Sequence, residues 1–308
     1  MEYPRIDALL LADVSCARNS LVLLKLLRPS VPDIFESAAD LFQWFSSAFA
    51  RSGYEKPLAV QFENCAKEMG ISPRELDSLI ESDDANPLVC QARLADRALI
   101  ARQAQKYAFQ LAWRAFRWGS TDLRRLRVTA AYGYMRQQAE AMGLMVVFNE
   151  DRDFARRWLS ATENHRTLFF ESRAKAKDAM EQFDLKFIYD HASGMAMHAT
   201  FAAGVSASKF GSTVDHIVIE IGDQEFNPAD PFIFHLAVAY FLRIQERCFG
   251  ALPQVCPDLQ RDESTGRVAT FKALVEDVWW TLTRKYQDRI LAMQQAVSTG
   301  TPRQAQAK

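Results

Sequence analysis

Apolar residues recur every three or four positions along most of this 308-residue chain, which is the spacing of one face of an α-helix. Only 12 Gly and 11 Pro interrupt the pattern, whereas a sheet-rich chain of this length needs many more turns. Good helix formers, namely Ala, Leu, Gln, Glu and Arg, fill the intervening positions. The sequence therefore predicts an all-α, multi-helix, bundle-like protein of about ten helices.

One segment departs from the helical spacing. Residues 214–221 alternate apolar and polar side chains and are rich in β-branched residues, which is typical of a strand. Gly222-Asp223 follows and suits a tight turn. We therefore expect a short β-hairpin inserted near residues 213–226, directly after a helix that covers 182–208.

Residues 119–122, Gly-Ser-Thr-Asp, combine a helix-stopping glycine with residues that cap the start of a helix. They separate an expected helix at 88–118 from a second basic helix. We place a domain boundary there. The chain then divides into an N-terminal helical region, a C-terminal helical domain with the hairpin, and a polar tail expected to be disordered: 1–118, 119–297 and 298–308.

Charge is strongly segregated, although 37 Lys plus Arg against 38 Asp plus Glu give a net charge of −1. Between residues 97 and 136, nine basic residues accompany a single acidic residue, for a local charge of +8. Five arginines gather around Gly119: Arg114, Arg117, Arg124, Arg125 and Arg127. They form either a compact patch that binds nucleic acid, an anionic ligand or an acidic protein, or solvated arginines paired with the acidic remainder of the chain.

Aromatic residues are interleaved with this basic stretch, a pattern found in proteins that stack single-stranded nucleic acid. Tyr107 and Trp118 belong to it, as do Phe109, Trp113 and Phe116. The last three fall at helical spacing, however, which places them in the core.

Several classes of protein are disfavoured. The first seven residues include two acidic residues and a proline, where a signal peptide needs a basic start, and the uncharged span 191–208 is too polar to cross a membrane. The five cysteines do not have the spacing of metal ligands, and their odd number is typical of a protein whose thiols stay reduced. We expect a cytoplasmic protein without membrane contact. Neither a phosphate-binding loop nor a G-x-S-x-G elbow is present, which disfavours nucleotide hydrolysis and serine hydrolase chemistry. We expect no cofactor.

All five histidines lie between residues 165 and 235: His165, His191, His198, His216 and His235. His191 and His198 share a helical stripe, but seven residues correspond to a rise of about 10.5 Å, too far for one ion to bridge. We therefore predict no metal site and interpret these histidines as packed in a helix interface.

Two segments carry motifs of a known family. Arg136 and Glu140 form an R-x-x-x-E motif, a D-x-x-x-A-x-x-W motif follows at 151–158, and Tyr189, Ser193 and His198 form a Y-x-x-x-S plus His motif. Together these motifs resemble a widespread bacterial all-helical family of unknown function, over about residues 120–210. The resemblance implies an all-α fold and a polar cluster of the five named residues, and it supplies no activity.

Arg136 and Glu140 lie one helical turn apart and can form an ion pair. If their helix packs against the helix of Tyr189, Ser193 and His198, the buried polar groups must satisfy one another. Such a network is either a structural clasp or an acid/base pocket. In the second case His198, Glu140 and Tyr189 are the catalytic residues of a hydrolase or nuclease.

Residues 66–79 have the turn glycine and apolar spacing of a helix-turn-helix. With residues 93–99 they are similar to the first half of the DNA-binding domain of arabinose-type transcription regulators, over about 60–100. The second helix offers Arg74 alone against five carboxylates, which repel phosphates: Glu75, Asp77, Glu81, Asp83 and Asp84. The alternative interpretation of this segment is a plain helical corner that does not read DNA.

Three functions follow from these patterns. The one we favour is a non-catalytic binding module that recognises an anionic partner through the arginines around Gly119, together with Arg136 and Ser193. The alternatives are a hydrolase or nuclease that uses the His198 pocket, and a helix-turn-helix DNA-binding regulator.

Overall fold

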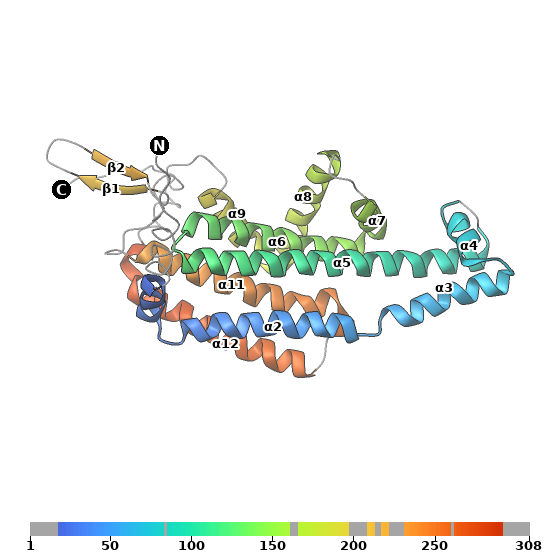
Figure 1. The fold of residues 1–308 in the computed structure, drawn as a ribbon, viewed down its shortest axis with the longest axis horizontal. Coiled ribbons are helices and arrows are strands. Elements are labelled where there is room, and N and C mark those ends of the chain that lie inside the picture. The colour runs from blue at the N-terminus through green and yellow to red at the C-terminus, as the bar shows by residue number, and fades with distance from the viewer. Residues whose placement is uncertain are drawn as a thin grey trace, which may run out of the picture.

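The computed structural model describes residues 18–82, 85–160, 166–196, 208–212, 217–221, 231–259 and 262–291. Helices account for nearly all of this part of the chain, so the predicted all-α class is confirmed. Figure 1 shows an elongated arrangement in which long helices lie side by side.

The N-terminal half of the chain forms long helices joined by short turns. A helix over 18–27 is followed by α2 (Val31–Arg51), α3 (Glu55–Met69), α4 (Pro73–Ile80), α5 (Pro87–Arg124) and α6 (Val128–Glu150). The C-terminal half adds α7 (Arg152–Ser160), α8 (Arg166–Met180), η1 (Glu181–Phe183), α9 (Leu185–Ala196), α11 (Phe232–Val255), η2 (Pro257–Leu259) and α12 (Asp262–Lys285). A last helical turn covers 287–291.

Helix α5 is the axis of the molecule (Figure 1). It starts at Asn86, whose side chain accepts a hydrogen bond from the Leu88 N–H at 2.9 Å, with Pro87 in the first helical position. Alanines occupy most of its buried positions, which lets α6 return closely along it. The reversal between the two helices places Leu126 at φ 62°.

In the main hydrophobic core, residues 23–49 pack against α5, α6, α9, α11 and α12. Its centre is aromatic: the Phe42 ring lies 4.8–5.7 Å from four other rings, those of Phe109, Trp113, Phe116 and Phe249. The prediction that Phe109, Trp113 and Phe116 pack inward is confirmed, since Phe109 and Phe116 are buried and Trp113 packs against the core.

A second, smaller core holds together α3, α4 and the first turns of α5, which we call the distal head. Leu76 and Ile80 of α4 pack there against Cys65 and Val89. The head lies at the far end of α5 from the α5–α6 turn (Figure 1). Its separate core makes it an appendage of the bundle.

The predicted helix break at Gly119 is wrong, because α5 continues through this residue to Arg124. Gly119 allows neighbouring side chains to pack closely against α5, because a Cβ at this position would lie 2.6 Å from the Phe241 ring and 3.2 Å from Tyr134 Cβ. The proposed domain boundary at 118/119 thus falls inside a helix, and α2 shares one core with the C-terminal helices.

The hairpin predicted near 213–226 is a second error, because the strand pairs with a segment that precedes it. Strand β2 (Ile217–Ile221) pairs in antiparallel fashion with β1 (Ser208–Ser212), which precedes it, and Ser208 lies opposite Ile221. Residue 208, which the helical pattern placed in a helix, lies in β1, and α9 ends at Ala196. The β1 sequence, Ser-Lys-Phe-Gly-Ser, lacks the β-branched signal that marks β2.

Gly143 provides a test of how closely α6 and α8 pack. A Cβ at this position would lie 2.5 Å from the Ala176 backbone oxygen. We expect Gly143→Ala to lower the free energy of unfolding by about 1–3 kcal/mol, because backbone cannot move aside as a side chain can. Gly266→Ala in α12 is the control: nothing lies within 4 Å of its Cβ, so higher helix propensity should stabilise the protein by up to about 1 kcal/mol. Urea unfolding of both variants distinguishes the two effects, and equal shifts would contradict the packing argument.

Candidate functional site

The structure divides the basic stretch into two parts. In the N-terminal part each cation has an acidic partner: Arg97 pairs with Asp153 at 3.1 Å, Arg102 with Asp258, and Lys106 with Glu55 at 2.5 Å. These partners come from distant segments of the chain. This half of the stretch therefore holds elements together and offers no free charge to a ligand.

The C-terminal part differs. Arg114, Arg117, Arg124 and Arg127 are exposed, and among the described residues no carboxylate lies within 4 Å of their guanidinium groups. We call these four residues the arginine face. Two acidic residues lie nearby. Burial raises the pKa of the Asp122 carboxyl group, and Arg127 and Arg125 partly offset that rise. Glu36 of α2 lines a hollow together with Arg124. Arg125, the fifth predicted member, is half-buried.

Beside the arginine face, α5 exposes an unusual row of large side chains. Tyr107, Leu111, Arg114 and Trp118 are spaced by four, three and four residues, so they form one stripe along the helix. The exposed fractions of Tyr107, Leu111 and Trp118 are 47%, 42% and 53%. Soluble proteins seldom leave a continuous apolar row uncovered without a use for it.

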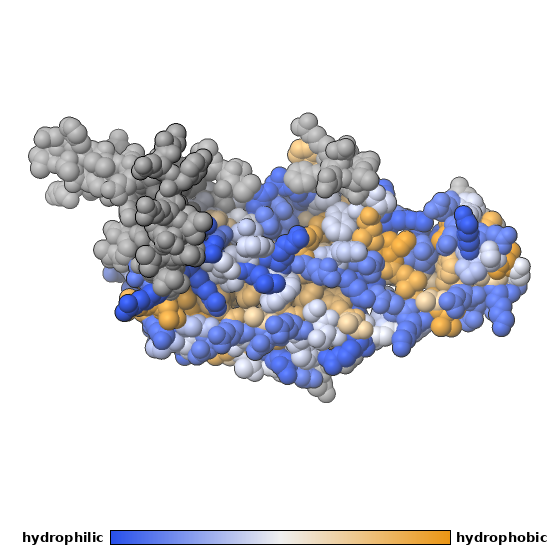
Figure 2. Space-filling model, in the orientation of Figure 1, coloured by the Kyte–Doolittle hydropathy of each residue, from blue (hydrophilic) through white to orange (hydrophobic). Residues whose placement is uncertain are grey.

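This stripe borders two adjoining hollows that share Leu111 and Arg114, and together we call them the α5 groove. One hollow, of about 220 Å³, lies towards α6 and is also lined by Trp118, Tyr134, Glu140 and Leu144. The other, of about 540 Å³, lies towards α7 and is also lined by Tyr107, Trp158 and Leu159. Away from this groove, Figure 2 shows hydrophobic residues gathered over the part of α5 between α7 and the distal head, with hydrophilic residues around them.

The polar cluster that the family resemblance implied is partly assembled. Arg136 Nε donates to Glu140 Oε1 at 3.1 Å, and the Arg136 guanidinium lies 5.5 Å from the centre of the Tyr189 ring. Arg173 of α8 completes the arrangement, at 3.5 Å from Glu140 and 3.3 Å from the Tyr189 hydroxyl. No motif singles out Arg173 in the sequence, so sequence reasoning missed it.

One predicted member of this cluster is not hydrogen-bonded to it, and another lies outside the described residues. Ser193 is buried, and its hydroxyl has no hydrogen-bond partner among the residues that the structure describes. His198 lies outside the described residues, as do His165 and His216. Glu140 is already bound by two guanidinium groups. This occupancy suits a structural clasp between α6, α8 and α9 better than a general base.

His191 lies in an aromatic contact of the same interface. Its ring centre is 5.4 Å from that of Tyr132 and 4.4 Å from that of Tyr240. Burial lowers the pKa of His191 to about 4, so the imidazole is neutral at physiological pH. Within the described ranges, no group of three or more His, Cys, Asp or Glu residues could hold a metal ion.

The helix-turn-helix segment does form a helical corner. Gly70 ends α3 at φ 68°, and Ser72 and Glu75 form a capping box that starts α4, whose hydrogen bonds lower the pKa of Glu75. The α4 face that points to solvent carries Arg74 with Glu75 and Asp77, and Glu81, directly after α4, pairs with Arg156 at 2.8 Å. That face is accessible but acidic, which disfavours contact with phosphates.

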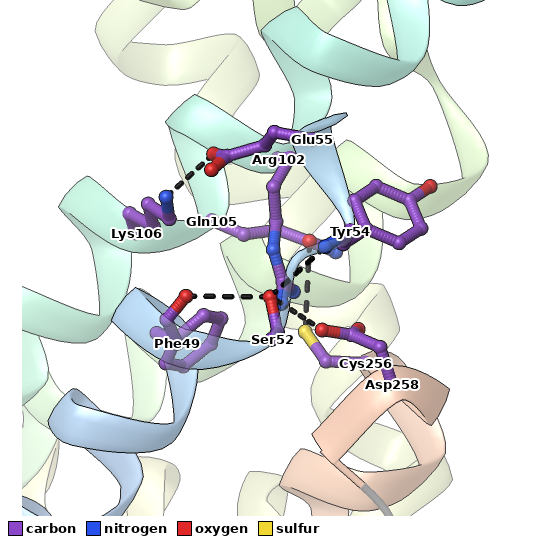
Figure 3. A network of polar contacts seen from close by, with 9 residues as sticks. All are labelled: Phe49, Ser52, Tyr54, Glu55, Arg102, Gln105, Lys106, Cys256 and Asp258. Carbon is purple, nitrogen blue, oxygen red and sulfur yellow. Dashed lines mark hydrogen bonds and ion pairs between the residues drawn. The ribbon is translucent and has the colours of Figure 1, made fainter. Parts of the chain in front are cut away.

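Figure 3 shows a buried network of polar contacts between the end of α2 and the start of α3. Arg102 is 2% exposed and pairs with Asp258, while one of its nitrogens lies 3.4 Å from the Ser52 hydroxyl. Its guanidinium also stacks 4.4 Å from the centre of the Phe49 ring. This network fastens α2, α5 and η2 together, and Arg102 is therefore a structural residue.

Comparison of the chain with protein-family models, with curated proteins and with solved structures finds no match. The two resemblances described above therefore stay predictions. None of the described helices combines the length and the apolar character needed to span a membrane.

Proposed function

We propose that this protein is a binding module that recognises an anionic partner through the arginine face. The observation that carries the proposal is the contrast within one stretch of sequence. Arg97, Arg102 and Lys106 are neutralised by distant carboxylates, whereas the four arginines of the arginine face have none within 4 Å among the described residues.

The spacing of these arginines supports a common target. Arg117 and Arg124 are seven residues apart and share one side of α5, while Arg127 lies in the turn that follows. Exposed guanidinium groups that are close together and lack counter-charges raise the local positive potential, which attracts anions and speeds their association. Guanidinium groups also form paired hydrogen bonds with carboxylate and phosphate.

The proposed function is non-catalytic. Glu140 and Tyr189, the described members of the alternative catalytic set, are both engaged by arginines. A binding role needs no such groups, whereas a hydrolase or nuclease would need one of them to act on a substrate.

Replacing Arg114, Arg117, Arg124 and Arg127 together by Gln is expected to weaken the binding of anions by roughly tenfold or more at low salt. Two labelled probes, poly-thymidine and poly-glutamate, report which class of anion is bound, and fluorescence anisotropy measures their affinity. A matched control removes four exposed cations elsewhere, at Arg51, Lys56, Lys67 and Arg74. Equal loss in both variants, or affinity independent of salt, would contradict a localised site.

A further inference from the structure

The geometry points to one class of partner for this site: an amphipathic helix of another protein, with an apolar stripe and acidic residues beside it, which docks in the α5 groove. This inference rests on the proposed function and names its ligand. It is carried by the shape of the groove, the character of its lining and the position of its charges.

The shape fits a short helix. From Tyr107 to Trp118 the exposed stripe rises by about 16 Å, close to three helical turns. Its spacing of four, three and four residues is the repeat with which one helix packs along another. Residues of α6 and α7 form the two sides of the groove, so a docked helix would contact three helices and not α5 alone.

The lining is suited to aliphatic and aromatic side chains. Between Tyr107 and Trp118 the surface is formed by Leu111, with Leu144 on one side and Leu159 on the other. Helices bind such grooves with apolar residues at positions i, i+3, i+4 and i+7. Aromatic rings also line both hollows, Tyr134 on the α6 side and Trp158 on the α7 side. A nucleic acid that stacks its bases is therefore the competing partner that the test must distinguish.

The positive charges of the groove favour a helix that carries acidic residues. Arg114 lines both hollows, and Arg117 is exposed one turn away on the same helix. The one carboxylate in the described lining, that of Glu140, is bound by Arg136 and Arg173. The groove therefore presents unpaired positive charge beside apolar surface, and Arg114 and Arg117 supply it, whereas Arg124 lines a separate hollow with residues of α2.

The test measures the binding of the full-length protein to four labelled probes by fluorescence anisotropy. The probes are a Leu/Glu peptide with helical amphipathic spacing, a scrambled peptide of the same composition, a peptide with Lys in place of Glu, and poly-thymidine. Leu111→Gln and Trp118→Gln alter the groove. Leu94→Gln and Trp280→Gln are matched controls, because Leu94 and Trp280 are also exposed, at 59% each, and do not line the groove.

We expect the amphipathic acidic peptide to bind at least tenfold more tightly than the scrambled one, since truncation of a central aromatic contact commonly costs that much. Leu111→Gln and Trp118→Gln should remove this preference, and the two control variants should keep it. Circular dichroism of all four variants checks that the fold is retained.

Three results would overturn the inference, and they separate it from the proposed function. If both acidic peptides bind equally, the arginine face recognises charge alone and only this inference fails. If poly-thymidine binds more tightly than the amphipathic peptide and is insensitive to Leu111→Gln, the partner is a nucleic acid. If no acidic probe binds, or the Lys peptide binds best, the proposed function fails as well.

Discussion

Replacing Arg102 by Met is expected to lower the free energy of unfolding by about 3 kcal/mol, because it leaves the Asp258 carboxylate without its partner in a largely buried site. The change also removes the contacts of the guanidinium with the Phe49 and Tyr54 rings, at 4.4 and 5.1 Å. Urea unfolding followed by circular dichroism measures the loss.

Lys106→Met is the matched control for Arg102→Met. Its ion pair with Glu55 lies one turn further along α5 but is much more exposed, so we expect a loss below about 1 kcal/mol. The double variant Arg102→Met/Asp258→Asn should recover part of the stability, because it removes the stranded charge. Equal effects of Arg102→Met and Lys106→Met would show that the buried network of Figure 3 is not a fastening point.

The second large effect is a loss of stability in mild acid. His235 is fully buried: one ring nitrogen lies 2.8 Å from the Leu23 carbonyl oxygen and the other 2.7 Å from the Tyr286 hydroxyl. The Leu23 oxygen can only accept, so Nε2–H donates to it and Nδ1 accepts from the hydroxyl. Burial lowers the pKa of His235 to about 4, and burial does the same to His191.

The direction of the pH effect follows from these values. The unfolded chain binds a proton at each histidine near pH 6.5, and the folded chain does so only near pH 4. The stability contributed by the neutral imidazoles is therefore complete above pH 6.5 and is lost as the pH falls towards 4. We expect a loss of up to about 3 kcal/mol for each of the two histidines.

Urea unfolding at a series of pH values between 7 and 5 measures the first part of this loss, above the range in which most carboxyl groups titrate. His235→Gln can keep a donor to the Leu23 oxygen but does not titrate. We expect it to remove about half of the pH dependence, whatever its effect at neutral pH. A flat profile in the wild-type protein, or one unchanged in the variant, would contradict the burial of a neutral histidine.

Local features of the fold were readable from the sequence. The spacing of Phe109 and Phe116 placed them in the core, and Gly70 with Ser72 marked a helical corner. Each of these depends on neighbours within a few residues. The propensities and caps that act over such short distances are properties of the sequence itself.

Features that depend on distant segments were not readable. Glycine is a residue type that often ends helices, but at position 119 it is required because a side chain would collide with the Phe241 ring. The partner of β2 lies before it and carries no strand signal. Arg102 and Asp258 are 156 residues apart, so nothing local distinguishes the paired Arg102 from the unpaired Arg117.

The candidate site depends on the same distinction. The sequence showed nine cations in one stretch, and the structure shows which of them have acidic partners and which do not. The Arg136–Glu140 pair was predictable from its spacing of four residues. Arg173, from another helix, was not.

The central claim is that the arginine face and the α5 groove bind an acidic partner. The most direct measurement is the dissociation constant of the acidic amphipathic peptide as a function of salt concentration, for the wild-type protein and for the variant with Gln at Arg114, Arg117, Arg124 and Arg127. The account predicts that affinity falls steadily with salt in the wild type and that the variant loses both affinity and most of this slope. The same slope in both proteins, or an affinity that salt does not change, would contradict it.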